Sequence, residues 1–308
     1  MSWEVVVDGK NYYKRLDKFL RNTLKDVPLS AIYKFIRKGK VYVNGKRVKD
    51  QKFSLEIGDT VSIRYVDMDK FRRRRENVIE PQKLDLDVIY EDEDILVLNK
   101  PAGLAIHPGK NIHLVTLIEG LLYYGNEKGF EPHLVHRLDL NTSGVLIVAK
   151  SKNVARVLTK DFKERRVKKY YKALVRGKIS SAGKIDKELD GQRAITFYKP
   201  ERFYEIFDEG VTLVNVEIGT GRKHQIRRHF STISHHIVGD NRYGEKVYNR
   251  KFRNLTGLKR QFLHCYKIKI EHPSSGGEKV FIADLSSDLR KVLDLVERHS
   301  KMESEVKW

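Results

Sequence analysis

A lone acid, Asp139, stands in a turn between an arginine and the triplet Thr-Ser-Gly, within the segment HLVHRLDLNTSGVLIVAK at 133–150. The five apolar residues at 145–149 predict an interior strand, because the run is short and rich in β-branched side chains. Gly144 allows the chain to turn sharply into that strand. A carboxylate held on a short loop against a rigid sheet could act as a nucleophile or as a base. An isolated acid in a turn is more often a cap or an ion-pair partner, but the surrounding pattern favours a chemical role.

A second cluster of chemically capable side chains occupies 219–229, which reads GTGRKHQIRRH. Two glycines end a predicted strand and begin a predicted helix, whose free N–H groups and positive dipole end favour phosphate. A glycine-rich turn alone is weak evidence. Four cations and two histidines within eleven residues, however, indicate a binding or catalytic segment. The cations are Arg222, Lys223, Arg227 and Arg228.

The strands and helices that must position these segments follow one another irregularly. Strands are predicted around 95–98, 145–149, 170–175 and 214–218, and amphipathic helices around 114–122, 154–162 and 289–296. Ser151 is expected to cap the second of these helices. This order favours an α+β fold, with a mostly antiparallel mixed sheet flanked by helices, over a regular βαβ arrangement.

A charged stretch at 67–83, VDMDKFRRRRENVIEPQ, breaks the apolar periodicity and is predicted to be a basic linker. It divides the chain into a small α+β unit at 1–66 and a larger unit at 84–308. In the small unit, helices are expected around 16–20 and 32–36, the second capped by Ser30. An Asn-Gly turn at 44–45 is expected between two short strands, and a further strand at 61–65.

Positive side chains gather on one face of the small unit. Lys34, Arg37 and Lys38 lie away from the apolar face of its second helix, and Lys40 follows across the turn. A single sign of charge with few acids between predicts a phosphate-binding face. The segment resembles the S4 RNA-binding module through RLDKFL at 15–20 and the run at 36–45, although Ala31 stands where such modules commonly carry an arginine.

Composition restricts the function classes further. Lys and Arg number 61 and Asp and Glu 41 among 308 residues, a net charge of +20 that suits a polyanionic partner. Nucleic acid is the first candidate and an anionic membrane surface the second, but no segment approaches the roughly 18 apolar residues of a spanning helix. The amino terminus shows no signal peptide. Cys265 is the single cysteine, so we expect no disulfide and no cysteine-based zinc site. A chain without disulfides favours a reducing, cytoplasmic compartment. The spacing of the histidines predicts no metal site.

Three motifs in the larger unit together resemble the RluA/RluD-type pseudouridine synthases. They are HRLD-x-x-TSG, the K-x-Y-x-A-L-V element at 169–175, and TGR-x-HQIR-x-H followed by VGD and YG, and the likeness spans roughly residues 86–285. An S4 module ahead of such a domain is common in the family. The turn at 101–109 matches the first family motif, and Asn141 stands where an acid is usual.

The resemblance implies site-specific isomerisation of uridine to pseudouridine in RNA, with Asp139 as the essential acid. Asp139 would either attack C1′ of the ribose or remove a ribose proton, and the enzyme must hold the cleaved anionic base in both schemes. Arg227 is implied as the cation that pairs with Asp139 and keeps it ionised, a role less suited to Arg222. Tyr171 would stack on the flipped uracil and could remove the C5 proton, although a tyrosine in a strand is by itself more often a core residue.

Other implied contacts are with the RNA. Arg137 would fill the gap left in the RNA stack, His136 would support the loop or touch RNA, and His107 and Arg222 would bind the substrate. The reaction is a redox-neutral isomerisation, so no cofactor is expected. The predicted substrate is ribosomal RNA, most of all that of the large subunit, and no obligate protein partner is evident.

Two other classes of function stay open at this point. A non-catalytic RNA-binding or ribosome-assembly factor could keep the fold without using Asp139. A glycosidase or an RNA-modifying transferase could use Asp139 differently, but a glycosidase would ordinarily need a second acid that we cannot identify, and a methyltransferase a Gly-rich nucleotide loop.

Overall fold

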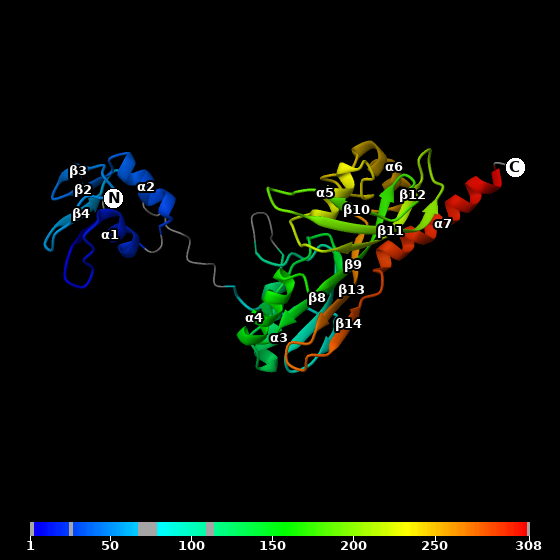
Figure 1. Ribbon diagram of the computed structural model, residues 1–308, viewed down its shortest axis with the longest axis horizontal. Coiled ribbons are helices and arrows are strands. Elements are labelled where there is room, and N and C mark those ends of the chain that lie inside the picture. Colours follow the sequence, from blue (N-terminus) through cyan, green and yellow to red (C-terminus); the bar gives the residue numbers. More distant parts are fainter. Residues whose placement is uncertain (1–2, 25–26, 67–78, 109–113, 307–308) are drawn as a thin grey trace. The chain divides into compact units, whose positions relative to one another are not determined.

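The computed structural model describes residues 3–24, 27–66, 79–108 and 114–306, so the linker predicted at 67–83 lies mostly outside the described residues. The chain forms two compact units, Met1–Ile79 and Glu80–Trp308 (Figure 1). Among the described helices, none combines the length and the apolar character that crossing a bilayer requires.

The N-terminal unit is a four-stranded antiparallel sheet with two helices. Its strand order is β1-β4-β2-β3, with β1 at Trp3–Val6, β2 at Val41–Val43, β3 at Lys46–Val48 and β4 at Thr60–Ile63. The helices are α1 (Leu16–Thr23) and α2 (Leu29–Arg37). Their apolar faces bury side chains such as Phe19 and Phe35 in a core of their own. The Asn-Gly turn predicted between β2 and β3 is confirmed, since Asn44 and Gly45 both have positive φ, 49° and 76°, as a two-residue hairpin turn of this type requires.

One local prediction in this unit is wrong. Ser30 does not cap α2, because the helix begins at Leu29 and the N-cap is Pro28, which has an extended backbone (φ −58°, ψ 140°). Proline fits the start of a helix because it lacks the N–H that an interior position would need. Ser30 therefore lies inside the first turn.

A ten-stranded mixed sheet forms the centre of the second unit. Eight strands follow the order β10-β11-β12-β9-β13-β8-β6-β5, while β14 pairs with β13 and β7 with β8. Among the described strands, β13 and β8 are the one parallel pair, which confirms the expected mostly antiparallel sheet. The strands are β5 (Val88–Glu91), β6 (Ile95–Lys100), β7 (His133–Leu134), β8 (Ser143–Ala149), β9 (Lys168–Arg176), β10 (Gly183–Asp186), β11 (Ile195–Tyr204), β12 (Val211–Ile218), β13 (Leu263–Glu271) and β14 (Glu278–Ile282).

The described helices of the second unit pack around this sheet (Figure 1). They are α3 (Leu117–Lys128), α4 (Lys152–Lys163), α5 (Gln225–Thr232), α6 (Lys246–Thr256) and α7 (Ser287–Val306). Ser151 caps α4 as predicted, because its hydroxyl accepts a hydrogen bond from the Val154 N–H at 3.3 Å. Helix α3 begins three residues later than expected, so the exposed Leu114 precedes it.

Strand β8 positions the loop that carries Asp139. All of its residues are buried, and it lies between β6 and β13. Gly144 has φ 116°, and a Cβ atom at this position would lie 2.1 Å from the carbonyl oxygen of Cys265 on β13. Only glycine permits so close an approach of the two backbones. The loop before β8 is thus fixed at the edge of a rigid core.

Candidate active site

A pocket of about 200 Å³ opens where the loop before β8 meets β9 and the start of α5. Among the described residues that line it, Asp139 is the single acid. Tyr171 reaches it from β9 and Arg227 from α5. The two segments that the sequence marked as chemically capable, 88 residues apart at Asp139 and Arg227, therefore form one site.

Arg227 joins two carboxylates. Its Nη1 donates a hydrogen bond to Oδ2 of Asp139 at 3.0 Å, while Nε and Nη2 donate to Oδ2 and Oδ1 of Asp240 at 2.6 and 2.9 Å. Arg227 is 8% exposed. A planar guanidinium held on one side by a bidentate pair has a fixed orientation on the other. Asp240 therefore determines where Arg227 meets Asp139.

Asp240 was not identified from the sequence as a site residue. Its burial favours the neutral acid, but hydrogen bonds from Arg227 and from the N–H groups of Tyr243 and Arg242 outweigh that effect and lower the pKa of Asp240. The carboxylate is fully buried. In the sequence only the short Val-Gly-Asp pattern marks Asp240, and this pattern does not indicate that Arg227 is its partner.

Lys100, at the end of β6, holds the Asp139 loop through hydrogen bonds to its backbone. Its Nζ donates to the carbonyl oxygens of Pro101 at 2.8 Å, Leu140 at 3.2 Å and Thr142 at 3.2 Å. The side chain is 1% exposed, and its burial, with the nearby charge of Arg260, lowers the pKa of Lys100 to about 8. An ammonium group enclosed by these backbone carbonyls fixes the segment that directly follows Asp139. The sequence suggested no role for this lysine.

Tyr171 lines the pocket as a neutral phenol. It is 5% exposed, and burial raises its pKa well above 10, with a further contribution from a hydrogen bond to Cys265. A phenol that resists ionisation is a poor base but keeps a flat apolar ring. Its setting therefore favours the expected stacking contact over the expected proton removal.

His224 also lines the pocket, and no role was predicted for it from the sequence. It precedes α5 in the left-handed conformation with φ 54°, and its Nδ1 lies 2.9 Å from the Tyr243 hydroxyl. Its Nε2 is 3.8 Å from Oδ1 of Asp139, beyond hydrogen-bond distance. Burial and the charge of Arg227 lower the pKa of His224, although Asp139 opposes them. The imidazole is thus neutral at neutral pH.

Two backbone N–H groups of the turn before α5, which its glycines suggested as a phosphate-binding turn, are engaged in internal hydrogen bonds. The Arg222 N–H donates to Oε1 of Gln225 at 3.1 Å, and the Gln225 N–H donates to the Arg222 carbonyl at 3.1 Å. These groups are therefore satisfied within the turn. The exposed side chain of Arg222 lies at the pocket, and Arg137 lines it as well.

Comparisons with known proteins agree with this geometry. Residues 94–232 match the family of RNA pseudouridylate synthases, and residues 14–61 match the S4 domain. The ribosomal large subunit pseudouridine synthase C of Vibrio parahaemolyticus is 40% identical over 94% of this chain and 95% of that protein. The chain belongs to the RNA pseudouridylate synthase family. It is an RNA pseudouridine synthase with an N-terminal S4 domain, as its motifs predicted.

Other relatives of this synthase extend over nearly the whole chain. The synthase C of Escherichia coli strain K12 is 39% identical over 94% of this chain and 95% of that protein. An uncharacterized RNA pseudouridine synthase of Aquifex aeolicus is 34% identical over 96% and 98%. Among solved structures, human RNA Pseudouridylate Synthase Domain Containing 1 covers 72% of this chain and is itself covered to 97%, with 27% identity and a TM-score of 0.55.

Two predicted substrate contacts of the synthase lie outside the Asp139 pocket. His107 is exposed and lines a neighbouring depression of about 490 Å³, which Arg137 also lines. His136 lies against the core, where its Nε2 accepts a hydrogen bond from the Ile147 N–H at 2.9 Å and its ring stacks on Phe162 at 4.7 Å. Its Nδ1 is shielded from solvent. These contacts fit loop support, while His136 also lines the depression beside His107, so an RNA contact stays a prediction.

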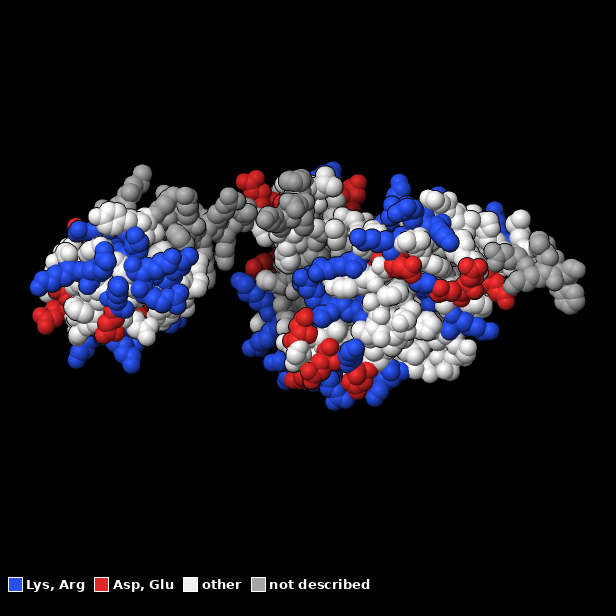
Figure 2. All heavy atoms as spheres, turned by 90° about the horizontal axis from the view of Figure 1, so that it is seen from above, with Lys and Arg blue, Asp and Glu red and all other residues white. Residues whose placement is uncertain are grey.

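The predicted phosphate-binding residues of the synthase belong to the N-terminal unit. Lys34 and Arg37 are in the last turn of α2 and Lys38 is its C-cap; all three are exposed. Lys40 is half-buried, with its Nζ 5.4 Å from the centroid of the Tyr65 ring. Lys and Arg side chains cover much of the face of this unit that Figure 2 shows.

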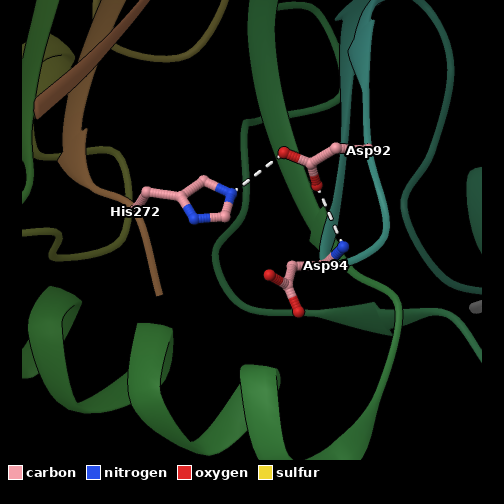
Figure 3. Close-up of side chains that lie close together, drawn as sticks. All are labelled: Asp92, Asp94 and His272. Carbon is pink, nitrogen blue, oxygen red and sulfur yellow. Dashed lines mark hydrogen bonds and ion pairs between the residues drawn. The ribbon is translucent and has the colours of Figure 1, made fainter. Parts of the chain in front are cut away.

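Asp92, Asp94 and His272 form a separate group of the synthase whose ligand-type atoms lie within 4.8 Å of one another (Figure 3). The carboxylate of Asp92 is already fully engaged. Its Oδ2 accepts from Tyr90 at 2.7 Å and contacts His272 at 2.9 Å, and its Oδ1 accepts the N–H groups of Asp94 and Ile95, both at 2.9 Å. The group ties the β5–β6 turn to the end of β13.

Proposed function

We propose that this enzyme converts specific uridines of large-subunit ribosomal RNA to pseudouridine, with Asp139 as the reacting acid. The similarity to proteins named ribosomal large subunit pseudouridine synthase C supports the substrate, because it extends over 94% of the chain. The observation that carries the role of Asp139 is its position: it is the one acid among the pocket-lining residues that the structure describes, and it is paired with Arg227.

The two oxygens of Asp139 are suited to different tasks. Oδ2 accepts the hydrogen bond from Arg227, whereas Oδ1 accepts none from any described residue. Oδ1 is therefore the atom available to the ribose, either to attack C1′ or to remove a proton. In each case the N1–C1′ bond breaks, the uracil turns while bound, and C5 joins C1′.

The remaining pocket residues would bind the extruded nucleotide. Tyr171 offers a flat ring on which the uracil can stack, and its raised pKa keeps that ring uncharged. Arg137 is exposed beside the pocket and would occupy the space that the flipped base leaves in the RNA. Arg222 and His107 would contact the flanking backbone.

The N-terminal unit would hold the RNA through its phosphates. In this proposal residues 1–66 act as the RNA-binding domain, 67–83 as a basic linker and 84–308 as the catalytic domain. Lys34, Arg37, Lys38 and Lys40 supply the positive face. The enzyme would work in the cytoplasm, the compartment that its RNA substrate and its single cysteine favour.

Replacing Asp139 tests the proposal directly. Tritium release from large-subunit ribosomal RNA labelled at C5 of uridine should fall at least about 10³-fold in Asp139→Asn, because the amide keeps the contact with Arg227 but cannot act as a nucleophile or base. Asn141→Asp, which restores the acid usual in the family two positions away, is the matched control and should keep the wild-type rate.

Mapping of pseudouridines completes the test. Cells that lack the protein should lose one or more pseudouridines from large-subunit ribosomal RNA, and Asp139→Asn should fail to restore them. Restoration by Asp139→Asn would mean that the protein acts as a non-catalytic factor. Losses confined to transfer RNA would exclude the proposed substrate but not the reaction.

A further inference from the structure

Lys169 lies in the active-site pocket, and no described residue supplies it with a counter-ion. It is two residues before Tyr171 on β9, and side chains at this spacing in a strand point to the same face. Both line the pocket with Asp139. The preceding residue, Lys168, is exposed and forms an ion pair with Glu217 at 3.6 Å. Two adjacent lysines on opposite faces of one strand thus have very different surroundings.

The surroundings of Lys169 are uncharged or apolar. Its Nζ lies 5.5 Å from the centroid of the Phe162 ring, and the Cys265 thiol is nearby. Across the described parts of the chain, no carboxylate pairs with it, and its burial lowers its pKa. A Cβ atom on Gly221 would lie 3.3 Å from Nζ, so the absence of a side chain there leaves room for the ammonium group. Lys169 is half-buried, and cations withdrawn from water are normally paired, because desolvation is costly.

We propose that the ammonium group of Lys169 holds the negative charge of the uracil after the N1–C1′ bond has broken. This inference rests on the proposed function. No described residue neutralises Lys169. The cleaved base would do so, because it becomes an anion inside the pocket.

A phosphate of the RNA fits this position less well than the base does. Arg222 and Lys223 are exposed at the same pocket and can meet phosphates without removing them from water. Lys169 lies deeper, beside Tyr171, where the base would stack. The uracil is neutral when it enters, so its attraction to the ammonium group develops only as the bond breaks. An interaction of this kind stabilises the transition state more than the ground state.

The chemistry balances without another reactant. When the N1–C1′ bond breaks, its electron pair leaves with the uracil, and the negative charge spreads over N1, O2 and O4. Lys169 donates an N–H hydrogen bond to one of these oxygens and keeps its proton throughout. The bond from C5 to C1′ then removes the charge from the ring, and loss of the C5 proton with protonation of N1 completes the isomerisation.

Single-turnover kinetics of the full-length chain on a large-subunit ribosomal RNA transcript tests this role. Lys169→Met should lower the rate constant by roughly 10²-fold or more, the usual cost of removing one preorganised donor, while the Kd for the RNA changes less than about threefold. Lys168→Met is the matched control and should stay within about twofold of wild type in both. If Lys169→Met does not fold, Lys169→Gln carries the same comparison.

Chemical rescue separates charge from packing. Lys169→Cys should be as slow as Lys169→Met, and aminoethylation of the new thiol, which restores an ammonium at the same reach, should recover at least about tenfold in rate. Treated wild-type protein controls for modification of the buried Cys265.

The outcomes distinguish the two proposals. An inactive wild-type enzyme on this transcript would count against the proposed substrate. An active wild type with a Lys169→Met rate within about threefold would overturn the Lys169 role alone. A rate loss that aminoethylation does not recover, or a loss equal to the loss of RNA affinity, would also overturn it.

Discussion

The two units of this enzyme carry their positive charges in different ways. In the N-terminal unit Arg37 and Lys38 are exposed at the end of α2. In the second unit Lys100, Arg227 and Arg260 are only 1%, 8% and 7% exposed, and each is bonded to specific carbonyl or carboxylate oxygens. Each exposed cation adds its own contribution to the binding of a polyanion, and salt screens that contribution. A buried cation instead holds the groups bonded to it in fixed positions. Loss of an exposed cation should weaken binding, and loss of a buried one should damage turnover or the fold.

Among the bonded buried cations, Arg227 should give the largest effect when it is replaced by methionine. This substitution removes the cation between Asp139 and Asp240, so we expect a loss of roughly 10²-fold or more in turnover and about 3–5 kcal/mol in the free energy of unfolding, because Asp240 is left as an unpaired buried charge. Single-turnover kinetics and urea unfolding measure the two effects separately.

A double variant separates the chemical loss from the structural one. Arg227→Met combined with Asp240→Asn removes the unpaired charge but keeps an acceptor for the N–H groups of Arg242 and Tyr243. Much of the lost stability should return while turnover stays low. Recovery of both would show that Arg227 only stabilises the fold. A loss confined to RNA affinity would mean that Arg227 contacts a phosphate. This buried cation would then act as the exposed cations of the N-terminal unit do.

Charge removal on the N-terminal unit should have a smaller effect of a different kind. Arg37→Gln with Lys38→Gln should weaken RNA binding by roughly tenfold near physiological salt and reduce the slope of log K against log[salt] by up to about 2, since each phosphate contact contributes 0.7–0.9 to that slope. The single-turnover rate at saturating enzyme should not change. Filter binding at several salt concentrations gives both quantities.

The matched control removes two exposed cations from the other helix of the same unit. Lys18→Gln with Arg21→Gln, on α1, takes away equal charge. If this variant weakens binding as much as the α2 variant does, net charge rather than a phosphate-binding face governs the affinity of the unit.

Much of the fold could be predicted from local patterns. The apolar run of β8, the alternation in β12, the helix capped by Ser151 and the Asn-Gly turn all report on neighbours within a few residues. Strands β10, β11, β13 and β14 were not predicted. Their patterns are weaker: β10 and β11 mix buried with exposed positions, and β13 owes its central place to pairing with β8 and β9, which lie far away in the sequence.

The site shows the same division between local and distant information. Asp139, Tyr171 and Arg227 could be selected because they belong to recognisable motifs, although their roles are still proposals. Lys100 could not, since a lysine at the end of a strand gives no sign that its ammonium group will be enclosed by three carbonyl oxygens, two of them from residues 40 and 42 positions later. Residues that act through burial are hidden from a sequence because burial depends on the whole fold.

His136 extends the contrast to a group whose charge is decided mainly by burial, and it should give the smallest effect. Burial, with the charge of Lys169 nearby, lowers its pKa from 6.5 to about 3 in the folded protein. The unfolded chain binds a proton below pH 6.5 and the folded one does not, so this stability is present above pH 6.5 and is lost as the pH falls below it. Between pH 7 and pH 5.5 the loss from this residue should be about 1 kcal/mol.

His136→Gln should remove that part of the pH dependence while its amide oxygen still accepts the Ile147 N–H. Urea unfolding at pH 7 and pH 5.5 should show a decrease about 1 kcal/mol smaller in the variant than in wild type. Between pH 7.5 and 8.5, where the imidazole is neutral in both states, the two proteins should respond to pH alike. An unchanged decrease at pH 5.5 would mean that His136 can be protonated in the folded enzyme.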